Sequence, residues 1–218
     1  MENHFEMELD ALRQKLLLMA SHAEAAVNLA VQSFVQRDSE LAARVDQDDE
    51  ILDRLEVEID EMTILVLTKA PLASDLRLVP VVMKISQNLE RIGDEATKIA
   101  RRARDLAREP AVKINFDFHR LVGKSIEMVK LALDAFARRD AAAALAVIPR
   151  DKEVDALNKE IQQQMIRHMT ENPATIGRCL HWIVAAKSLE RIADHAKNIA
   201  EEVVYLREAQ DIRHTLKN

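Results

Sequence analysis

LERIGDEATKIA, from Leu89 to Ala100, returns one hundred positions later as LERIADHAKNIA, from Leu189 to Ala200. The chain has 218 residues, so each copy belongs to about half of the protein. A period of this length far exceeds the roughly 20 to 50 residues of a solenoid unit, and it indicates a duplicated bundle. Features that both copies keep are therefore the first candidates for function.

The composition predicts an all-α fold. Hydrophobic residues make up 48% of the chain, aromatic residues only 3%, and glycine occurs three times. Such a composition is typical of long packed helices and disfavours a sheet. Prolines at 71, 110, 149 and 173 fall between the helical stretches. The predicted helices span residues 5–37, 48–69, 74–108, 116–139, 150–171 and 175–209.

These six helices form two antiparallel three-helix bundles, residues 1–110 and 111–218, because short links favour antiparallel neighbours. The duplication extends beyond the quoted segment, since Phe34, Arg37 and Asp38 recur as Phe136, Arg139 and Asp140. Apolar residues at alternating steps of three and four predict the buried seams. The seams are Leu52, Leu55, Ile59, Met62 and Val66; Val82, Ile85, Leu89, Ile92, Ala96 and Ile99; and Ala185, Leu189, Ile192, Ala196 and Ile199.

The charge balance excludes several functions. A net charge of −6 gives no basic field for nucleic acid or an anionic membrane surface. The acidic start MENHFEMELD does not resemble a secretion signal, and the apolar run at 16–19 is too short to span a bilayer. We therefore expect a cytoplasmic protein without nucleic-acid partners. The single cysteine, Cys179, is interpreted as a core residue.

Paired carboxylates form the most informative chemical pattern. Glu90 and Asp94 lie four residues apart, as do Glu190 and Asp194, so each pair projects from one helix face. The preceding helices carry Asp49 with Asp53 and Asp151 with Asp155 at the same spacing. In two neighbouring antiparallel helices, residues at the same height have residue numbers that add up to a constant. In each half, the pair on one helix and the pair on the next meet this condition, so the two pairs should face each other. The sequence therefore predicts two clusters of four carboxylates on the open, outer faces of the bundles.

A bound cation would offset the repulsion within each cluster, which costs about 0.2 to 0.5 kcal/mol for every like-charged pair at this spacing. Oxygen ligands suit Mg²⁺, Mn²⁺ or Ca²⁺ and also allow iron. The lack of ligand-spaced cysteine and histidine argues against a structural zinc site, although zinc stays among the candidate ions. The alternative is a solvated acidic face, partly neutralised by Lys98. His195 is interpreted as a surface residue outside the site.

At these residues the chain resembles the PhoU family of phosphate-signalling proteins. The resemblance spans nearly the full length, through the duplicated three-helix plan, the DLR of Asp75–Arg77, and the motifs LERIGD and LERIAD. It implies a non-catalytic cytoplasmic regulator, commonly a homodimer, that restrains a histidine sensor kinase when phosphate is plentiful. The implied partners are that kinase and the ATPase of a phosphate ABC transporter, with membrane contact only through them.

The resemblance also implies metal ions at the acidic motifs. In this sequence the matching positions are Asp49, Asp53, Glu90, Asp94, Asp151, Asp155, Glu190 and Asp194. The family's usual asparagine after the motif is present as Asn198 but replaced by Lys98 in the first half. Two other functions stay open on the residues alone. One is a carboxylate-bridged metal enzyme, either a di-metal oxidase or a hydrolase, and the other is a purely structural helical adaptor.

Overall fold

Helices make up nearly all of the described chain, which in this computed structural model comprises residues 2–68, 73–112 and 116–213. No β-strand occurs among these residues. The elements in chain order are α1 (Glu2–Gln36), α2 (Ser39–Leu67), α3 (Ala73–Ala107), α4 (Phe118–Arg138), α5 (Ala141–Val147), the 3₁₀ turn η1 (Ile148–Arg150), α6 (Asp151–Glu171), the 3₁₀ turn η2 (Pro173–Thr175) and α7 (Ile176–Glu208). The predicted all-α fold with six long helices is confirmed.

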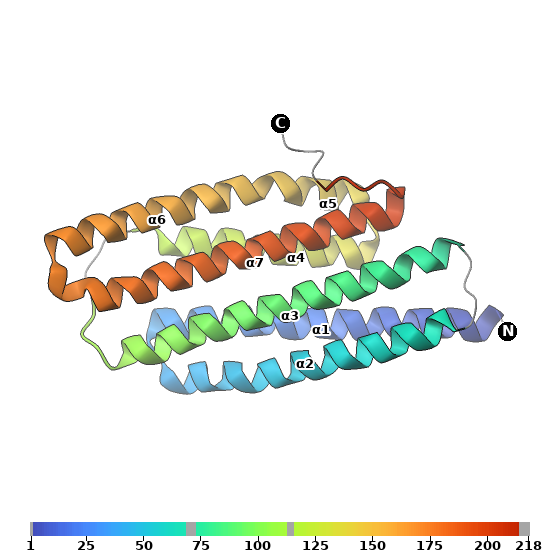
Figure 1. The fold of residues 1–218 in the computed structure, drawn as a ribbon, viewed down its shortest axis with the longest axis horizontal. Helices are drawn as coiled ribbons and strands as arrows, with labels where there is room; N and C mark the ends of the chain where they lie inside the picture. The colour runs from blue at the N-terminus through green and yellow to red at the C-terminus, as the bar shows by residue number, and fades with distance from the viewer. Residues whose placement is uncertain (1, 69–72, 113–115, 214–218) are drawn as a thin grey trace.

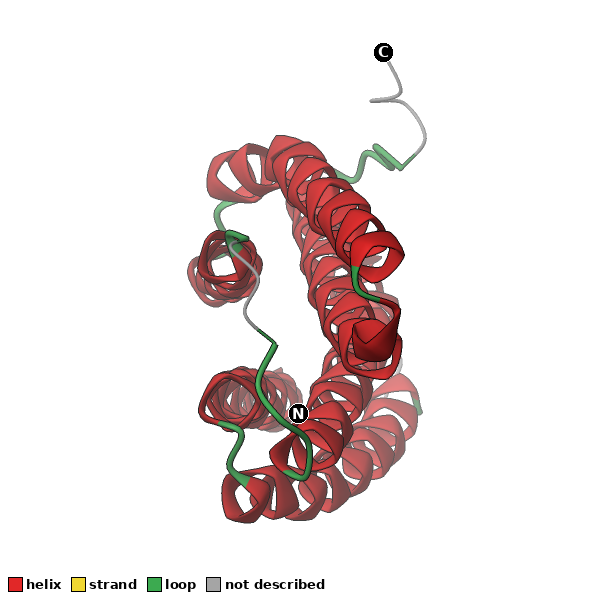
Figure 2. Cartoon of the chain, turned by 90° about the vertical axis from the view of Figure 1, so that its left-hand side faces the viewer, coloured by secondary structure: helices red, strands yellow, loops and turns green. Residues whose placement is uncertain are grey.

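The long helices are arranged in two layers. In one layer α2, α3, α7 and α6 lie side by side in that order, and α1 and α4 cover it from one side (Figures 1 and 2). Helices α1, α2 and α3 form the first three-helix unit, and α4, α6 and α7 with the short α5 form the second. The two units meet mainly where α3 runs antiparallel to α7 (Figure 1).

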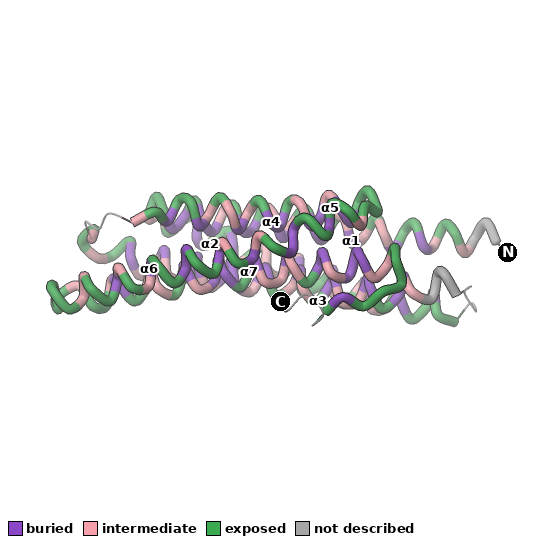
Figure 3. The backbone as a smooth tube through the Cα atoms, turned by 90° about the horizontal axis from the view of Figure 1, so that it is seen from above, coloured by how far each residue is buried: buried purple, intermediate pink, exposed green. Residues whose placement is uncertain are grey.

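One continuous core runs through both units. The predicted seams of α3 and α7 are fully buried, and those of α2 are buried except for Met62, which is partly buried. Buried positions face inward along every long helix, while exposed positions line the outside (Figure 3). Near the turn between the units, Trp182 of α7 makes edge contacts with Phe34 of α1 and Phe118 of α4, at centroid distances of 4.6 and 5.0 Å. The halves therefore share their hydrophobic stabilisation.

Equivalent turns end the first helix of each unit. Arg37 and Arg139 both adopt a left-handed backbone, with φ of 57° and 54°. The next residues, Asp38 and Asp140, close the turn with backbone bonds of 2.9 Å to Ser33 and Ala135. Their side chains then cap the following helices by accepting from backbone N–H groups. The predicted correspondence of these residues is thus visible in the backbone.

The second helix of the first unit begins earlier than predicted, whereas α6 of the second unit spans nearly the predicted range 150–171. Helix α2 starts at Ser39 instead of residue 48 and runs unbroken to Leu67. In the second unit the same stretch is divided into α5, η1 and α6. Pro149 has no N–H to donate, whereas its counterpart Gln47 does, so only the second unit breaks there. Pro71, predicted to separate the second and third helices, lies outside the described residues.

Gly93 and Leu52 fit together across α2 and α3. A Cβ atom added at Gly93 would come 2.4 Å from Leu52 Cδ1 and 3.2 Å from Asp49 Oδ1. The second unit has Ala193 and Val154 at the equivalent positions, both fully buried. Compared with the first unit, the second unit therefore has a larger residue on its third helix and a smaller one on its second helix.

We expect Gly93→Ala to lower the free energy of unfolding by about 1 kcal/mol, because overpacking costs about 1 to 3 kcal/mol and alanine recovers about 1 kcal/mol in helix propensity. Adding Leu52→Val should restore most of the loss, giving the pair found in the second unit. Urea unfolding of the two single variants and the double variant measures this coupling. Strictly additive effects would contradict the proposed fit, and Ala193→Gly serves as the control in the second unit.

Candidate functional site

The first acidic cluster joins α2 to α3. Asp49 and Asp53 come from α2, and Glu90 and Asp94 come from α3. Burial raises the pKa of Asp49, and the charges of Asp53 and Asp94 raise it further. Burial likewise raises the pKa of Glu90, with added repulsion from Asp94 and Asp53. The four carboxylates thus lie within one another's electrostatic field, as the antiparallel register predicted.

The second cluster repeats this arrangement between α6 and α7. Asp151 and Asp155 lie on α6, and Glu190 and Asp194 lie on α7. Burial raises the pKa of Asp155, as do Asp151 and a hydrogen-bonded Glu190. The pKa of Asp194 rises to about 6, first through burial and then through repulsion from Asp151, Glu190 and Asp155. The carboxylates of the second cluster therefore repel one another more strongly than those of the first.

The second cluster is less open than the sequence suggested. The side chains of Glu90 and Asp94 are 18% and 38% exposed, in keeping with an outer face. Those of Glu190 and Asp151 are only 11% and 7% exposed. Asp151 begins α6 directly after η1, which packs against α7 and covers this end of the cluster. The prediction of an open, wet site therefore holds only in part for the second cluster, where Asp155 is exposed and Asp194 partly buried.

Basic side chains partly neutralise both clusters. Arg91 contacts Glu90 and Asp94 at 3.3 and 3.2 Å. In the second cluster Lys197 Nζ lies 2.7 Å from Asp151 Oδ2, and Lys187 Nζ lies 2.5 Å from Glu190 Oε2. The position equivalent to Lys197 in the first half is Thr97, a buried neutral residue close enough to Asp49 to lower the pKa of that carboxyl. A lysine therefore enters the second cluster where the first has a neutral hydroxyl.

Lys98 does not have the role expected of it. Its Nζ lies 2.8 Å from Glu95 Oε1, on the side that faces α7, so its ion pair is made outside the predicted four-carboxylate cluster. Lys197, which sequence reasoning did not select, is the lysine that pairs within a cluster. Alignment of the repeats could have identified it, since a lysine replaces threonine beside four acids.

Metal coordination by these acids stays a prediction. Within the described ranges, no three histidine, cysteine, aspartate or glutamate side chains are placed so that they could hold a metal ion. The donor chemistry nevertheless fits a hard cation, because each half gathers four carboxylates whose charges repel one another. Ion binding would require Arg91 or Lys197 to give up its carboxylate partner, and it would relieve the repulsion that raises the pKa values.

A second polar feature, missed by sequence reasoning, crosses the boundary between the units. Glu95 of α3 is buried, and its Oε1 lies 3.2 Å from Arg191 of α7. Burial opposes its ionisation, but hydrogen bonds from Lys98 and Ser188 more than compensate and hold the pKa of Glu95 below its usual value. Its counterpart His195 lies half-buried with Nδ1 2.9 Å from Asn88 Oδ1. The interpretation of His195 as a surface residue is therefore wrong.

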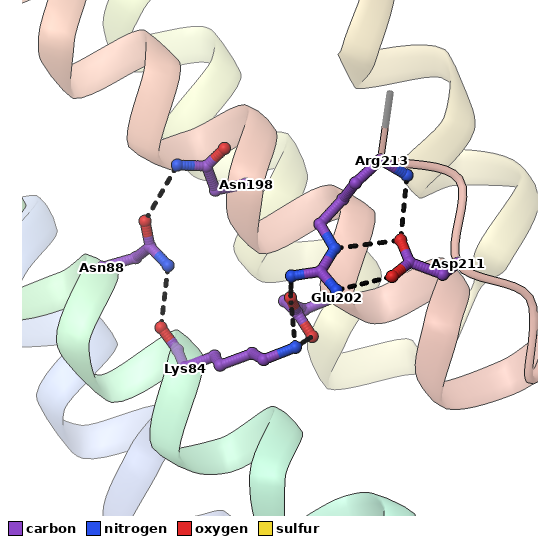
Figure 4. Close-up of polar contacts among 6 residues, drawn as sticks. All are labelled: Lys84, Asn88, Asn198, Glu202, Asp211 and Arg213. Carbon is purple, nitrogen blue, oxygen red and sulfur yellow. Dashed lines mark hydrogen bonds and ion pairs between the residues drawn. The ribbon is translucent and has the colours of Figure 1, made fainter. Parts of the chain in front are cut away.

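The contacts along this boundary are reciprocal. Asn88 meets His195, and the equivalent Ser188 meets Glu95, the counterpart of His195. Figure 4 shows the continuation, where Lys84 Nζ lies 3.0 Å from Glu202 Oε1 across the boundary. Arg213, from the segment after α7, approaches the same carboxylate at 3.7 Å. We name this row of contacts between α3 and α7 the polar seam.

The pKa of Asp194 makes a pH-dependent prediction. The folded protein holds this proton more tightly than the unfolded chain, so the contribution of Asp194 to stability falls as pH rises from about 4 to 6. Asp194→Asn should therefore stabilise the metal-free protein at pH 7.5 by about 1 to 2 kcal/mol, after a discount for partial exposure.

Urea unfolding in EDTA at about pH 7.5 and 4.5 measures the effect, which should shrink to a fraction of its neutral value at the lower pH. Asp94→Asn, in the more exposed first cluster, is the matched control and should give a smaller change. An Asp194→Asn protein that is less stable than wild type at neutral pH would contradict the sign.

Known proteins resemble this chain over nearly all of its length. It is 44% identical over 212 residues to the phosphate-specific transport system accessory protein PhoU homolog of Pseudomonas putida, a match that covers 96% of this chain and 83% of that protein. It is 36% identical over 211 residues to the phosphate-specific transport system accessory protein PhoU of Escherichia coli K12, covering 96% and 88% of the two chains.

Solved structures show the same fold. The crystal structure of PhoU from Pseudomonas aeruginosa matches with a TM-score of 0.92 at 42% identity, over 94% of this chain and 100% of the other. The phosphate transport system regulatory protein PhoU from Streptococcus pneumoniae matches with a TM-score of 0.88 at 25% identity, over 95% and 98%. The PhoU domain model matches twice, at residues 16–103 and 118–203. With two such domains, one in each half, this chain belongs to the PhoU family.

Proposed function

We propose that this chain is a non-catalytic cytoplasmic regulator that restrains phosphate uptake and phosphate-responsive gene expression by binding other proteins. The observation that carries the proposal is the near full-length match, in both repeats, to relatives named as accessory proteins of the phosphate-specific transport system. The proposed partners are a histidine sensor kinase and the ATPase of a phosphate ABC transporter, and the chain itself would act as a homodimer. Along the described residues, no helix combines the length and apolarity that a membrane span requires.

The two acidic clusters form surfaces whose charge would change when cations bind. One lies between α2 and α3 and the other between α6 and α7, and these four helices belong to the same layer (Figure 1). Divalent or trivalent ions such as Mg²⁺, Mn²⁺, iron or Zn²⁺ would change their charge and therefore the electrostatic match with a partner. As ligands of cations, the carboxylates of the two clusters need no catalytic role.

We expect the chain to associate stoichiometrically with the transporter ATPase or the sensor kinase, and the complex to be more abundant at high phosphate. Affinity capture of the tagged full-length chain from cells grown at high and low phosphate, with quantitative mass spectrometry, measures this. The untagged strain is the control. Failure to recover either protein under both conditions, after chemical cross-linking as well, would contradict the proposal.

Metal binding should depend on the four carboxylates of the first cluster. The variant Asp49→Ala, Asp53→Ala, Glu90→Ala, Asp94→Ala should lose about half of the bound metal, since the second cluster remains. Metal analysis of protein purified without chelators measures the loss. Glu50→Ala with Glu61→Ala, which removes two exposed acids from the same helix α2, is the matched control. Unchanged metal content in the fourfold variant would favour a structural role for the acids.

An exchange between the repeats tests the same point without deleting ligands. Lys197→Thr gives the second cluster the residue of the first, and Thr97→Lys does the reverse. Because Lys197 forms an ion pair with Asp151, Lys197→Thr should strengthen metal binding at the second cluster. Thr97→Lys should weaken it at the first. Calorimetric titration of each single variant separates the two sites, and shifts in the same direction for both would contradict the argument.

A further inference from the structure

Four arginines line a hollow at the end of the molecule where α1 and α3 begin and α7 ends (Figure 1). Its volume is about 540 Å³, within the range of sites for small molecules. The arginines come from four different parts of the fold: Arg13 of α1, Arg77 of α3, Arg139 after α4 and Arg207 of α7. Glu6 and Asp10 are the carboxylates of the lining, so positive charge predominates in a protein whose net charge is −6.

Three of these arginines have no carboxylate partner among the described residues. Arg13 is paired with Asp10, with 3.0 Å between Nη1 and Oδ1. Within the part of the chain that the structure describes, no hydrogen bond or ion pair engages the side chains of Arg77, Arg139 and Arg207. Elsewhere in the structure arginines are commonly paired, as Arg104 is with Asp46 and Arg120 with Glu153. The hollow therefore holds unneutralised guanidinium groups.

In the first repeat, the arginine at the equivalent turn binds the protein's own backbone. Arg37 donates through Nη2 to the backbone carbonyls of Leu106 and Glu109, at the end of α3. The equivalent residue Arg139 has the same left-handed backbone, but it lines the hollow beside Leu206 and Arg207 at the end of α7. A residue that closes a helix end in one repeat is thus left available in the other.

The chemistry favours a compact, multiply charged oxyanion. A guanidinium group presents its N–H donors in a planar fork that matches two oxygens of a phosphate. Groups that approach from α1, α3, α4 and α7 surround a small volume, which suits a compact anion better than an extended acidic segment. The adjoining hollow, about 450 Å³, shares Arg139 and Arg207, but it adds two carboxylates, Asp140 and Glu208, along with Arg138, so the first hollow offers an anion the more favourable charge.

We propose that this hollow, defined by Arg13, Arg77, Arg139 and Arg207, is a binding site for phosphate-class anions: inorganic phosphate, pyrophosphate or the phosphate groups of a nucleotide. The site is separate from both acidic clusters and needs no partner protein. It would let the chain respond to a phosphate compound directly, beyond the regulation of partners proposed above. Because binding is measured on the isolated protein, its failure would leave the partner experiment unaffected.

Calorimetric titration of metal-free, full-length protein with phosphate, pyrophosphate and ATP tests the site, and a chelator in the buffer excludes binding through a metal ion. The double variant Arg139→Asn, Arg207→Gln should weaken binding of the preferred anion at least tenfold. Asparagine is chosen at 139 because it tolerates the left-handed backbone. Arg77→Gln, on a different helix, should weaken binding independently.

Arg167→Gln, at an exposed position of α6 far along the chain from the hollow, is the matched control for loss of one charge and should leave binding unchanged. Helix content and melting temperature by circular dichroism confirm folding of each variant. The anion that binds tightest identifies the source of the phosphate group. The proposal is overturned if none of the three anions binds at millimolar concentration, if the double variant binds as well as wild type, or if citrate binds as tightly as the phosphate anions.

Discussion

Helices α3 and α7 are the inner helices of their own units, and their antiparallel contact determines how everything else is placed. Each buries one apolar face against its own unit and presents another to its partner, so their seams are fully buried along most of their length. The polar seam adds directional contacts to this apolar interface, since Oε1 of buried Glu95 is bound by both Arg191 and Lys98. Those contacts fix the register between the units, because a shift along the helices would leave a buried carboxylate unpaired.

That register also determines which surfaces become functional. Helices α2 and α6 pack on the far sides of α3 and α7, which places the acidic clusters at the two flanks of the same layer (Figure 2). The ends of α1, α3, α4 and α7 meet at one end of the molecule and enclose the arginine-lined hollow. The two kinds of site therefore have opposite charge and separate locations, and neither competes with the other for ligands.

Much of this arrangement could be predicted from the repeat and from helical periodicity. The seams of α2, α3 and α7 and the matched heights of the paired acids follow from spacing alone, because antiparallel helices with short links have a defined register. The start of α2 was predicted too late, because the stretch before residue 48 mixes polar residues with short apolar ones. Its helix is fixed by the Asp38 cap and by burial of Ala42 and Val45. His195 was misjudged and Glu95 was missed, because the burial of both depends on contact with the other unit.

The differences between the two clusters could also not be predicted from single sequence positions. Burial of Asp151 results from η1, which exists because Pro149 interrupts the helix. Alignment of the repeats points to Lys197, but its pairing with Asp151 depends on the heights of the two residues in the fold. Both repeats have the same carboxylate residues, but the residues packed around them differ. Equal residues in two repeats therefore need not have equal affinity, and metal or partner binding should be measured for each half separately.

The reciprocity of the polar seam has an evolutionary meaning. Asn88 meets His195 while Ser188 meets Glu95, so each contact has a counterpart related by an approximate two-fold axis between α3 and α7. Isologous contacts of this kind are the hallmark of a symmetric dimer. This internal symmetry is what the duplication and fusion of a gene for a self-associating single-repeat subunit would produce. In a single chain, twin positions can differ, as Glu95 and His195 do.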